Sequence, residues 1–314
     1  MKIRKQKISR RLFLKMTAIG AGSSVALMGG CRQFQPRGTG KIKIGMLPGG
    51  GCYRGQGFEE TVRRIAKAGF DGVMLFLHED FTRNNLAEIN RILKGEGLPV
   101  LQVHPPWPNI GSADQKVRNS ALDTYRRWIE YSRKIDAQTV IVHPSGADVP
   151  PDRNQALDLT VQAVRLMAGE ASPMVIAVEN VGPAAGVKQS VGSNPEELMW
   201  MVRTAGLSNI GICLDTSHCM ASGVDLQSFI TKAGPRIVTT HLHDLTLTYD
   251  PKKGGIKDEH LMFGMGKIDW EMFLSLLKAN CPAVPWIAEI EVKGTPQEQE
   301  RSFAEIANFL NKYH

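Results

Sequence analysis

Six short apolar runs of the chain are each followed by a residue that can bind a metal ion or transfer a proton. These residues are His104, His143, Glu179, Asp215, His241 and Glu289. A single histidine or carboxylate after a strand is usually a helix cap or a solvated loop residue. That explanation does not account for a residue of this kind directly after each of six separate runs. We therefore interpret the six residues as one functional set.

Four of these residues form a suitable ligand set for one divalent cation. They are Glu179, Asp215, His241 and Glu289. Three carboxylates with one imidazole and no thiolate favour Mn, Mg, Co, Fe or Zn. Glu179 and Glu289 come from runs three apart, so they can face each other across a substrate. Two opposed carboxylates beside a metal suit removal of a proton next to a carbonyl by one and its return by the other.

A second group of ligand-type residues points to different chemistry. This five-residue group consists of His104, His143, His218, Asp258 and His260. Together they could hold one or two more metal ions, and clustered metals are typical of phosphoester hydrolysis. By contrast, His78, His243 and Glu291 each have a neighbour better placed for such a role. We interpret these three as structural or solvated residues.

The elements that position these residues alternate between strands and helices. Nearly continuous, β-branched-rich runs predict buried parallel strands at 41–46, 72–77, 100–103, 139–142, 174–178, 210–214, 237–240 and 286–290. Helical spacing follows at 58–68, 86–94, 116–134, 155–167, 195–202, 226–231, 270–278 and 297–310. Eight such repeats over residues 41–314 predict an α/β fold, a (β/α)₈ TIM barrel whose strand ends share one face. The alternative, an open doubly wound sheet, lacks a phosphate-binding loop of the right spacing.

Residues 1–31 are typical of an export signal. Ser9-Arg10-Arg11-Leu12-Phe13-Leu14-Lys15 precedes an uncharged, moderately apolar run, an order similar to a twin-arginine signal peptide. Cys31 follows Leu27-Met28-Gly29-Gly30, which is similar to a lipoprotein cleavage site. Membrane anchoring through a lipid on Cys31 and ordinary cleavage both stay open. We expect a flexible linker at 32–40, the twin-arginine export machinery as a partner, and a periplasmic or otherwise extracytoplasmic location.

The positive charge of the chain lies in this leader. Residues 1–31 hold seven of the 38 Lys and Arg residues and no Asp or Glu, so the remaining chain carries 31 basic and 31 acidic residues. A balanced body gives no support for a nucleic-acid partner, which requires an excess of basic residues on the folded part. The four cysteines after Cys31 form no CxxC pair. Neither a thiolate zinc site nor a disulfide scaffold is indicated.

Several motifs occur in an order that resembles the xylose isomerase-like barrel superfamily, over roughly residues 41–312. They are Ile141-Val142-His143-Pro144, Val178-Glu179-Asn180, Leu214-Asp215-Thr216-Ser217-His218, His241-Leu242-His243-Asp244, His260 followed by Gly264-Met265-Gly266-Lys267-Ile268-Asp269-Trp270, and Ala288-Glu289. This superfamily contains sugar phosphate isomerases and epimerases, inosose dehydratases, hydroxypyruvate isomerases and repair nucleases of the endonuclease IV type.

The resemblance implies residue roles that differ between two branches. In the epimerases, the positions matching Glu179, Asp215, His241 and Glu289 hold the metal, and the two glutamates act as acid and base. The residue matching His218 contacts a substrate oxygen there. In the nucleases, a trinuclear zinc site also uses the positions that match the five-residue group. This chain has all of these residues.

The chain also departs from both branches. Its first strand, Gly45-Met46-Leu47-Pro48, lacks the histidine of the nucleases. Residues 245–248 lack the arginine of the ketose epimerases, and Met74 stands where a second-strand glutamate is common. The resemblance therefore does not identify the sugar.

Three functions are consistent with these residues and motifs. The first is an exported isomerase, epimerase or related lyase that uses a divalent metal (Mn, Mg, Co or Zn) on a small sugar or keto-sugar. Glu179 and Glu289 would then transfer the proton, and His218, His104 and His143 would contact the substrate. The alternatives are a multinuclear zinc phosphoester hydrolase of the endonuclease IV type and a non-catalytic sugar-binding lipoprotein. Metal content distinguishes the three.

Overall fold

The computed structural model describes residues 41–48, 57–76, 79–144, 152–183, 190–251 and 254–313. The predicted signal peptide over 1–31, the lipid-accepting Cys31 and the linker over 32–40 lie outside these residues, so they stay predictions. None of the described helices is long and apolar enough to span a lipid bilayer.

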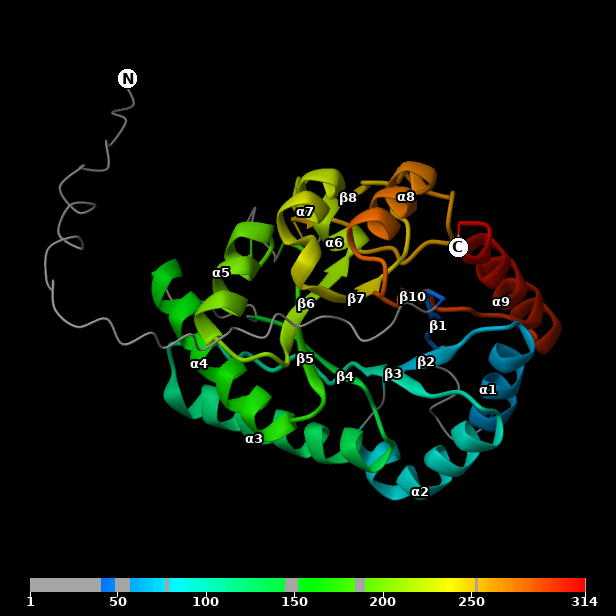
Figure 1. Cartoon of the computed structure of the whole chain (residues 1–314), viewed down its shortest axis with the longest axis horizontal. Helices are drawn as coiled ribbons and strands as arrows, with labels where there is room; N and C mark the ends of the chain where they lie inside the picture. Colours follow the sequence, from blue (N-terminus) through cyan, green and yellow to red (C-terminus); the bar gives the residue numbers. More distant parts are fainter. Residues whose placement is uncertain are drawn as a thin grey trace, which may run out of the picture. The chain divides into compact units, whose positions relative to one another are not determined.

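Eight parallel strands form a barrel surrounded by helices (Figure 1). The strands are β1 (Ile44–Met46), β2 (Gly72–Leu75), β3 (Val100–Val103), β4 (Thr139–Val142), β5 (Val175–Glu179), β6 (Ile210–Asp215), β7 (Ile237–His241) and β10 (Trp286–Ala288). They pair in chain order from β1 to β7, and β10 pairs with β1. Between β7 and β10 the Leu242 amide donates to Ile287 O at 2.8 Å, and the Glu289 amide donates to Leu242 O at 3.2 Å. The predicted (β/α)₈ TIM barrel is confirmed.

A helix is present at each predicted position, although the second helix begins at residue 79 and not at the predicted 86. These helices are α1 (Phe58–Lys67), α2 (Glu79–Gly95), α3 (Gln115–Lys134), α4 (Arg153–Ala171), α5 (Pro195–Ala205), α7 (Leu226–Ala233), α8 (Trp270–Asn280) and α9 (Pro296–Asn311). The structure adds elements that the hydrophobic pattern does not predict: α6 (Thr216–Ala221), the 3₁₀ helix η2 (Gly234–Arg236), and the antiparallel pair β8 (Tyr249–Asp250) and β9 (Gly255–Ile256). These elements are too short to show a hydrophobic period.

Local capping explains where the helices begin. At α5, the Asn194 side chain accepts from the Glu197 amide at 3.0 Å, and Pro195 occupies the first turn. Gly206 then ends the helix with a φ of 70°, a conformation that favours glycine. At α9, Thr295 and Glu298 form a reciprocal capping box. The predicted helix over 195–202 therefore begins where its capping residues stand.

The strands bury both of their faces, with alternate residues on each. Outward-facing residues join the main core under the helices, which contains the large side chains Trp128, Phe229, Phe273, Trp286 and Phe303. Inward-facing residues form separate small clusters: Leu47, Met74, Leu101 and Ile287 in one, and Ile141, Ala177 and Cys213 in the other. Because side chains on a strand alternate with a period of two, the residue two positions after Met74, Ile141, Ala177, Cys213 or Ile287 also points into the barrel. In β3 the register against β2 shifts, so Gln102 follows Leu101 on the inner face and bonds to Thr239.

Candidate active site at the carboxyl end of the barrel

The strand-end residues continue the inward-facing rows of the barrel. His143, Glu179, Asp215 and Glu289 stand two positions after Ile141, Ala177, Cys213 and Ile287, respectively. Gln102 and Thr239 bond to each other across the barrel, with Thr239 Oγ1 2.7 Å from Gln102 Oε1, and His104 and His241 follow two positions later. The fold therefore brings all six residues together in a layer at the carboxyl end, where barrel active sites are built.

The four-residue cluster of Glu179, Asp215, His241 and Glu289 gathers around one ring nitrogen. His241 Nδ1 lies 3.1 Å from Glu179 Oε1, 3.0 Å from Glu289 Oε2 and 3.8 Å from Asp215 Oδ2. One ligand atom from each of the four residues lies within 4.8 Å of the other three. All four residues are buried. This geometry fits one divalent cation among three carboxylates and an imidazole.

Glu179 faces a pair of histidines through its second oxygen. Glu179 Oε2 lies 3.0 Å from His143 Nε2 and 3.3 Å from His104 Nε2, and the two ring nitrogens are 3.3 Å apart. Neither nitrogen forms a well-aligned hydrogen bond with this buried oxygen, which therefore lacks one within the described part of the chain. Buried polar atoms normally have a partner, so a converging set without one indicates that a ligand belongs there. Glu179 would offer one oxygen to each of two candidate ligand groups, His104 with His143 and the four-residue cluster.

Asp258, in the loop after β7, joins the remaining two histidines of the five-residue group. Asp258 Oδ1 lies 3.0 Å from His260 Nε2, and Asp258 Oδ2 lies 3.6 Å from His218 Nε2. His218 Nδ1 in turn lies 3.3 Å from Glu179 Oε1. The five-residue group is therefore not a separate site but lies on both sides of Glu179.

Backbone carbonyls orient three of the histidines. Nδ1 of His104 lies 2.8 Å from Pro105 O, Nδ1 of His218 lies 3.1 Å from Asn180 O, and Nδ1 of His260 lies 3.1 Å from Glu289 O. When Nδ1–H donates to a carbonyl, Nε2 carries the lone pair and is the ligand atom. In His104 and His260 that nitrogen faces a carboxylate, whereas in His218 Nε2 faces Asp258 and Nδ1 also lies 3.3 Å from Glu179 Oε1.

Asp215 is held by the backbone of His218 and by two residues, His243 and Asn180, for which the sequence predicts no catalytic or ligand role. Its Oδ1 accepts from the His218 amide at 2.7 Å, and its Oδ2 lies 2.8 Å from His243 Nε2. Asn180 completes the support because its side-chain oxygen accepts from the Asp215 amide at 2.7 Å. His243 is fully buried, and its ring lies 4.0 Å from that of His260. Its proximity to Asp215 follows from the pairing of β6 with β7, which a search for strand-end ligands does not reveal.

Asp244 anchors the long loop that carries Asp258 and His260. The buried Asp244 carboxylate accepts from the amides of Leu245, Gly264 and Ile268 at 2.9, 3.0 and 3.2 Å, and from Trp270 Nε1 at 2.9 Å. Gly266 packs so closely on Asp244 and Leu245 that a Cβ there would lie 2.2 Å from an Asp244 oxygen. The motif around Gly264–Trp270 therefore has a structural role in placing the loop over the site. Of the other two residues given no role, Glu291 pairs with Lys293 at the surface and His78 lies outside the described residues.

The charges of the site are balanced by neighbouring groups. Burial disfavours the Glu179 carboxylate, but the His241 and His143 imidazoles outweigh burial and lower the pKa of Glu179 well below its usual range. Burial also disfavours protonated His260, yet the hydrogen bond to Asp258 and the charge of Glu289 raise its pKa to about 9. For His218, Asp215 and Asp258 similarly outweigh burial and raise the pKa. A metal ion bound here would displace these protons.

A family model for the xylose isomerase-like TIM barrel matches residues 62–313 of the chain. The chain belongs to this family. Its sequence relatives include a probable endonuclease 4 from Carboxydothermus hydrogenoformans, which is 25% identical over 264 residues, covering 77% of this chain and 90% of the relative.

Solved structures of other xylose isomerase-like barrels share the fold. The E. coli 3-keto-D-glucoside 4-epimerase YcjR has a TM-score of 0.68 at 17% identity, with 85% of this chain and 100% of YcjR covered. The IOLI protein with a bound zinc atom has a TM-score of 0.69 at 18% identity, with 87% of this chain and 96% of that protein covered. The sequence relative is thus named as an endonuclease, and a protein that shares the fold is named as a sugar epimerase. The comparisons therefore do not support the expectation that nucleic acid is excluded as a partner.

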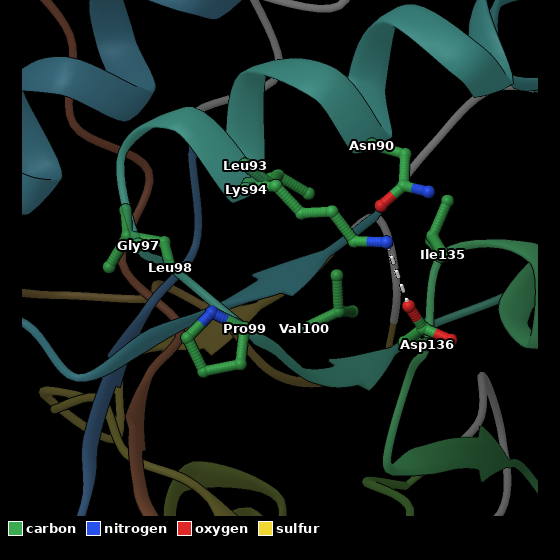
Figure 2. Close-up of a pocket in the computed structure, with 9 residues that line it drawn as sticks. All are labelled: Asn90, Leu93, Lys94, Gly97, Leu98, Pro99, Val100, Ile135 and Asp136. Atoms are coloured by element: carbon green, nitrogen blue, oxygen red, sulfur yellow. Dashed lines mark ion pairs between the residues drawn. The ribbon is translucent and has the colours of Figure 1, made fainter.

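A cavity at the opposite end of this xylose isomerase-like barrel has a different character. It has a volume of about 290 Å³ and lies between α2, the start of β3 and the turn after α3 (Figure 2). Apolar residues such as Leu93 and Val100 line it, and Lys94 Nζ lies 3.1 Å from Asp136 Oδ2 at its edge. Because Val100 begins β3 and His104 follows its end, this cavity is at the amino end, where residues usually serve stability.

Proposed function

We propose that the protein is an exported, divalent-metal-dependent isomerase or epimerase, or a related lyase, that acts on a sugar or keto-sugar. The observation that carries this proposal is the placement of Glu179 and Glu289. Glu179 ends β5, Glu289 directly follows β10, and both carboxylates lie within 3.1 Å of His241 Nδ1. Two carboxylates that share a metal position can exchange a proton with adjacent atoms of one substrate.

The donor set fits the proposed metal, Mn, Mg, Co or Zn. Glu179, Asp215, His241 and Glu289 would hold it, and its ligand atoms already converge. When bound, such an ion supplies positive charge next to a substrate carbonyl and stabilises the negative charge that develops there.

The chain's own residues would perform the proton transfer. One glutamate removes the proton from the carbon beside the carbonyl, and the electron pair of that C–H bond moves toward the oxygen. The other glutamate returns a proton at the neighbouring carbon or on the opposite face, which gives isomerisation or epimerisation. In a lyase, the same electron pair instead expels a leaving group from the next carbon. The lowered pKa of Glu289, caused by His241 against the opposing effect of burial, keeps it ionised and ready to accept a proton.

His218, His104 and His143 are the proposed substrate contacts. Each lies within 3.3 Å of a Glu179 oxygen, so a sugar hydroxyl beside Glu179 is within reach of their ring nitrogens. His143 is only partly buried, which leaves its ring accessible from the mouth of the barrel.

The test of this function is solvent exchange combined with conservative variants. With D-fructose, D-tagatose and methyl 3-keto-glucoside as probes in deuterated water, the metal-loaded protein should incorporate deuterium next to the carbonyl. Glu179→Gln and Glu289→Gln should each lower turnover by at least ~10², because glutamine keeps the size but cannot accept a proton. Turnover of a sugar without deuterium in the product would contradict the proton transfer.

A second candidate is a multinuclear zinc phosphoester hydrolase of the endonuclease IV type. The observation that favours it is the pair of additional ligand groups, with His104 and His143 facing Glu179 Oε2, and Asp258 facing His218 and His260. Two or three zinc ions per chain by elemental analysis, with cleavage of an abasic-site duplex, would select it. One ion per chain favours the first proposal, and none favours the third function, a sugar-binding lipoprotein.

Export by the twin-arginine pathway, and with it the periplasmic location, rests on residues 1–31 alone. Arg10→Lys combined with Arg11→Lys should retain the precursor in the cytoplasm. Unchanged periplasmic yield of the double variant would contradict it. Labelling with a radioactive fatty acid tests the lipid on Cys31, and Cys31→Ala is the control.

A further inference from the structure

One exposed tryptophan lies beside the candidate site. Trp107 is 53% exposed, although it follows β3 by only a few residues, whereas Trp128, Trp270 and Trp286 are buried. Trp200 is also exposed, but it lies on α5 among the surrounding helices. An exposed tryptophan at a site of convergent polar residues is typical of a ligand contact.

Trp107 extends a row of rings that begins inside the barrel. Its ring lies 5.5 Å from that of His143 with an angle of 17° between planes, and 5.8 Å from that of Phe76 with an angle of 30°. The His104 ring lies edge-on at 6.0 Å. Phe76 comes two positions after the inward-facing Met74, so it too points into the mouth. The indole is thus packed against site residues while about half of it stays open.

The segment that carries Trp107 is held in place at both ends. Pro105, Pro106 and Pro108 restrict its backbone. His104 is bonded to Pro105 O at 2.8 Å, and Arg118 Nη1 donates to Ser112 O at 2.6 Å. An apolar group on a restrained segment binds with little loss of conformational entropy. The exposure of Trp107 is therefore a fixed feature of the site's rim.

We propose that Trp107, backed by Phe76, is the stacking surface for the apolar face of the substrate's sugar ring. The inference rests on the proposed function and defines its substrate class. Aromatic faces carry partial negative charge, and the C–H bonds on one face of a pyranose complement it. Two of the rings around the indole also lie next to Glu179: Nε2 of His143 is 3.0 Å and Nε2 of His104 is 3.3 Å from Glu179 Oε2. As part of this proposal, the substrate reaches from the Glu179 carboxylate past these imidazole rings to the indole, as a hexose or a hexose linked to a further group would.

Fluorescence can isolate this residue, because Trp107 and Trp200 are the exposed tryptophans. In metal-loaded Trp200→Phe protein, at least one of D-fructose, D-tagatose and methyl 3-keto-glucoside should reduce acrylamide quenching of the exposed fluorescence. The response should vanish in the double variant Trp107→Phe/Trp200→Phe. A response to an abasic-site duplex and to none of the sugars, or no response to any probe, would overturn the proposal.

Kinetics separates this proposal from the proposed function. Trp107→Ala should raise KM by ~10-fold for the sugar that is turned over, Trp107→Phe should stay within ~3-fold, and Trp200→Ala should match the wild type. An unchanged KM in Trp107→Ala would overturn the stacking surface while the function stands. If a sugar reduces the quenching of Trp107 fluorescence but no deuterium enters the product, the stacking surface is supported and the proton transfer is contradicted.

Discussion

The two ends of the barrel use charged residues in opposite ways. At the carboxyl end, the Glu179 side chain is 1% exposed and its Oε2 has no hydrogen-bond partner among the described residues. At the amino end, the side chains of Lys94 and Asp136 are 64% and 73% exposed and pair with each other beside an apolar cavity (Figure 2). The barrel therefore has buried, converging charged groups at the carboxyl ends of its strands and solvated charged groups at the amino end.

This difference distinguishes two kinds of charged residue. Some contribute to the stability of the fold, whereas others are only held in position by the fold. Burying a carboxylate is unfavourable unless opposite charge and hydrogen bonds compensate it. Among the described residues, this compensation for Glu179 comes from histidines that could instead bind a metal, so its burial is not explained by stability. An exposed ion pair such as Lys94–Asp136 contributes ~1 kcal/mol or less. Substitutions at the two ends should therefore affect different measurements.

The largest effect is expected from removing a ligand of the four-residue cluster. Asp215→Ala and His241→Ala should each lower metal affinity by more than ~100-fold, beyond the range typical of residues that only support a ligand. The barrel should stay folded by circular dichroism, because these side chains belong to the site layer and not to the core. Elemental analysis after gel filtration measures the loss. Wild-type occupancy in both variants would refute the assigned site.

The sequence was sufficient to predict the barrel because its strands are buried on both faces. Runs such as 139–142 and 210–214 are continuously apolar, and the strand ends they define carry the site residues. The barrel topology then requires these ends to converge, so Glu179, Asp215, His241 and Glu289 could be grouped without coordinates.

The sequence could not predict how the ligands are held. Spacing alone favours a structural or solvated role for His243, because His241, two positions earlier, is better placed. The contact of His243 with Asp215 depends on β6–β7 pairing and on the turn into α6. Likewise, Glu179 faces His143 through Oε2 and His241 through Oε1, and the sequence does not show which oxygen faces which ring. Side-chain orientation of this kind is fixed by packing, not by spacing.

A smaller effect is expected from His243, which contacts a ligand but belongs to no predicted set. His243→Ala should weaken metal binding by ~10–100-fold, because Asp215 Oδ2 loses the ring nitrogen at 2.8 Å. His243→Asn, whose side chain can still donate a hydrogen bond, should recover part of the affinity. Titration with Co²⁺ followed by absorption measures both. Equal affinity in the wild type and His243→Ala would show that Asp215 is oriented without it.

Acidification should weaken metal binding at the carboxyl end gradually. The pKa of His260 is raised to about 9 and that of His218 also lies above its usual value, so both rings are protonated at neutral pH. A metal ion that binds through His218 or His260 must displace the proton on that ring. Metal affinity should therefore rise by up to ~10-fold per pH unit for each displaced proton, until the pH exceeds about 9. Chelator competition at several pH values measures the slope. A metal affinity that does not change with pH would show that metal binding displaces no proton from these two rings.

The smallest effect is expected at the amino end, where Asp136 allows the backbone and the ion pair to be separated. Asp136 has a φ of 55°, a left-handed conformation that glycine adopts without strain. Asp136→Gly and Asp136→Ala both remove the pair with Lys94, so any difference between them comes from the backbone. Asp136→Ala should be less stable than Asp136→Gly by roughly 1 kcal/mol in urea unfolding, because its Cβ disfavours this φ.

Both variants should bind metal like the wild type, since the cavity lies beyond the start of β3 and His104 lies beyond its end. A change in metal affinity in either variant would show that the two ends are coupled through the strand.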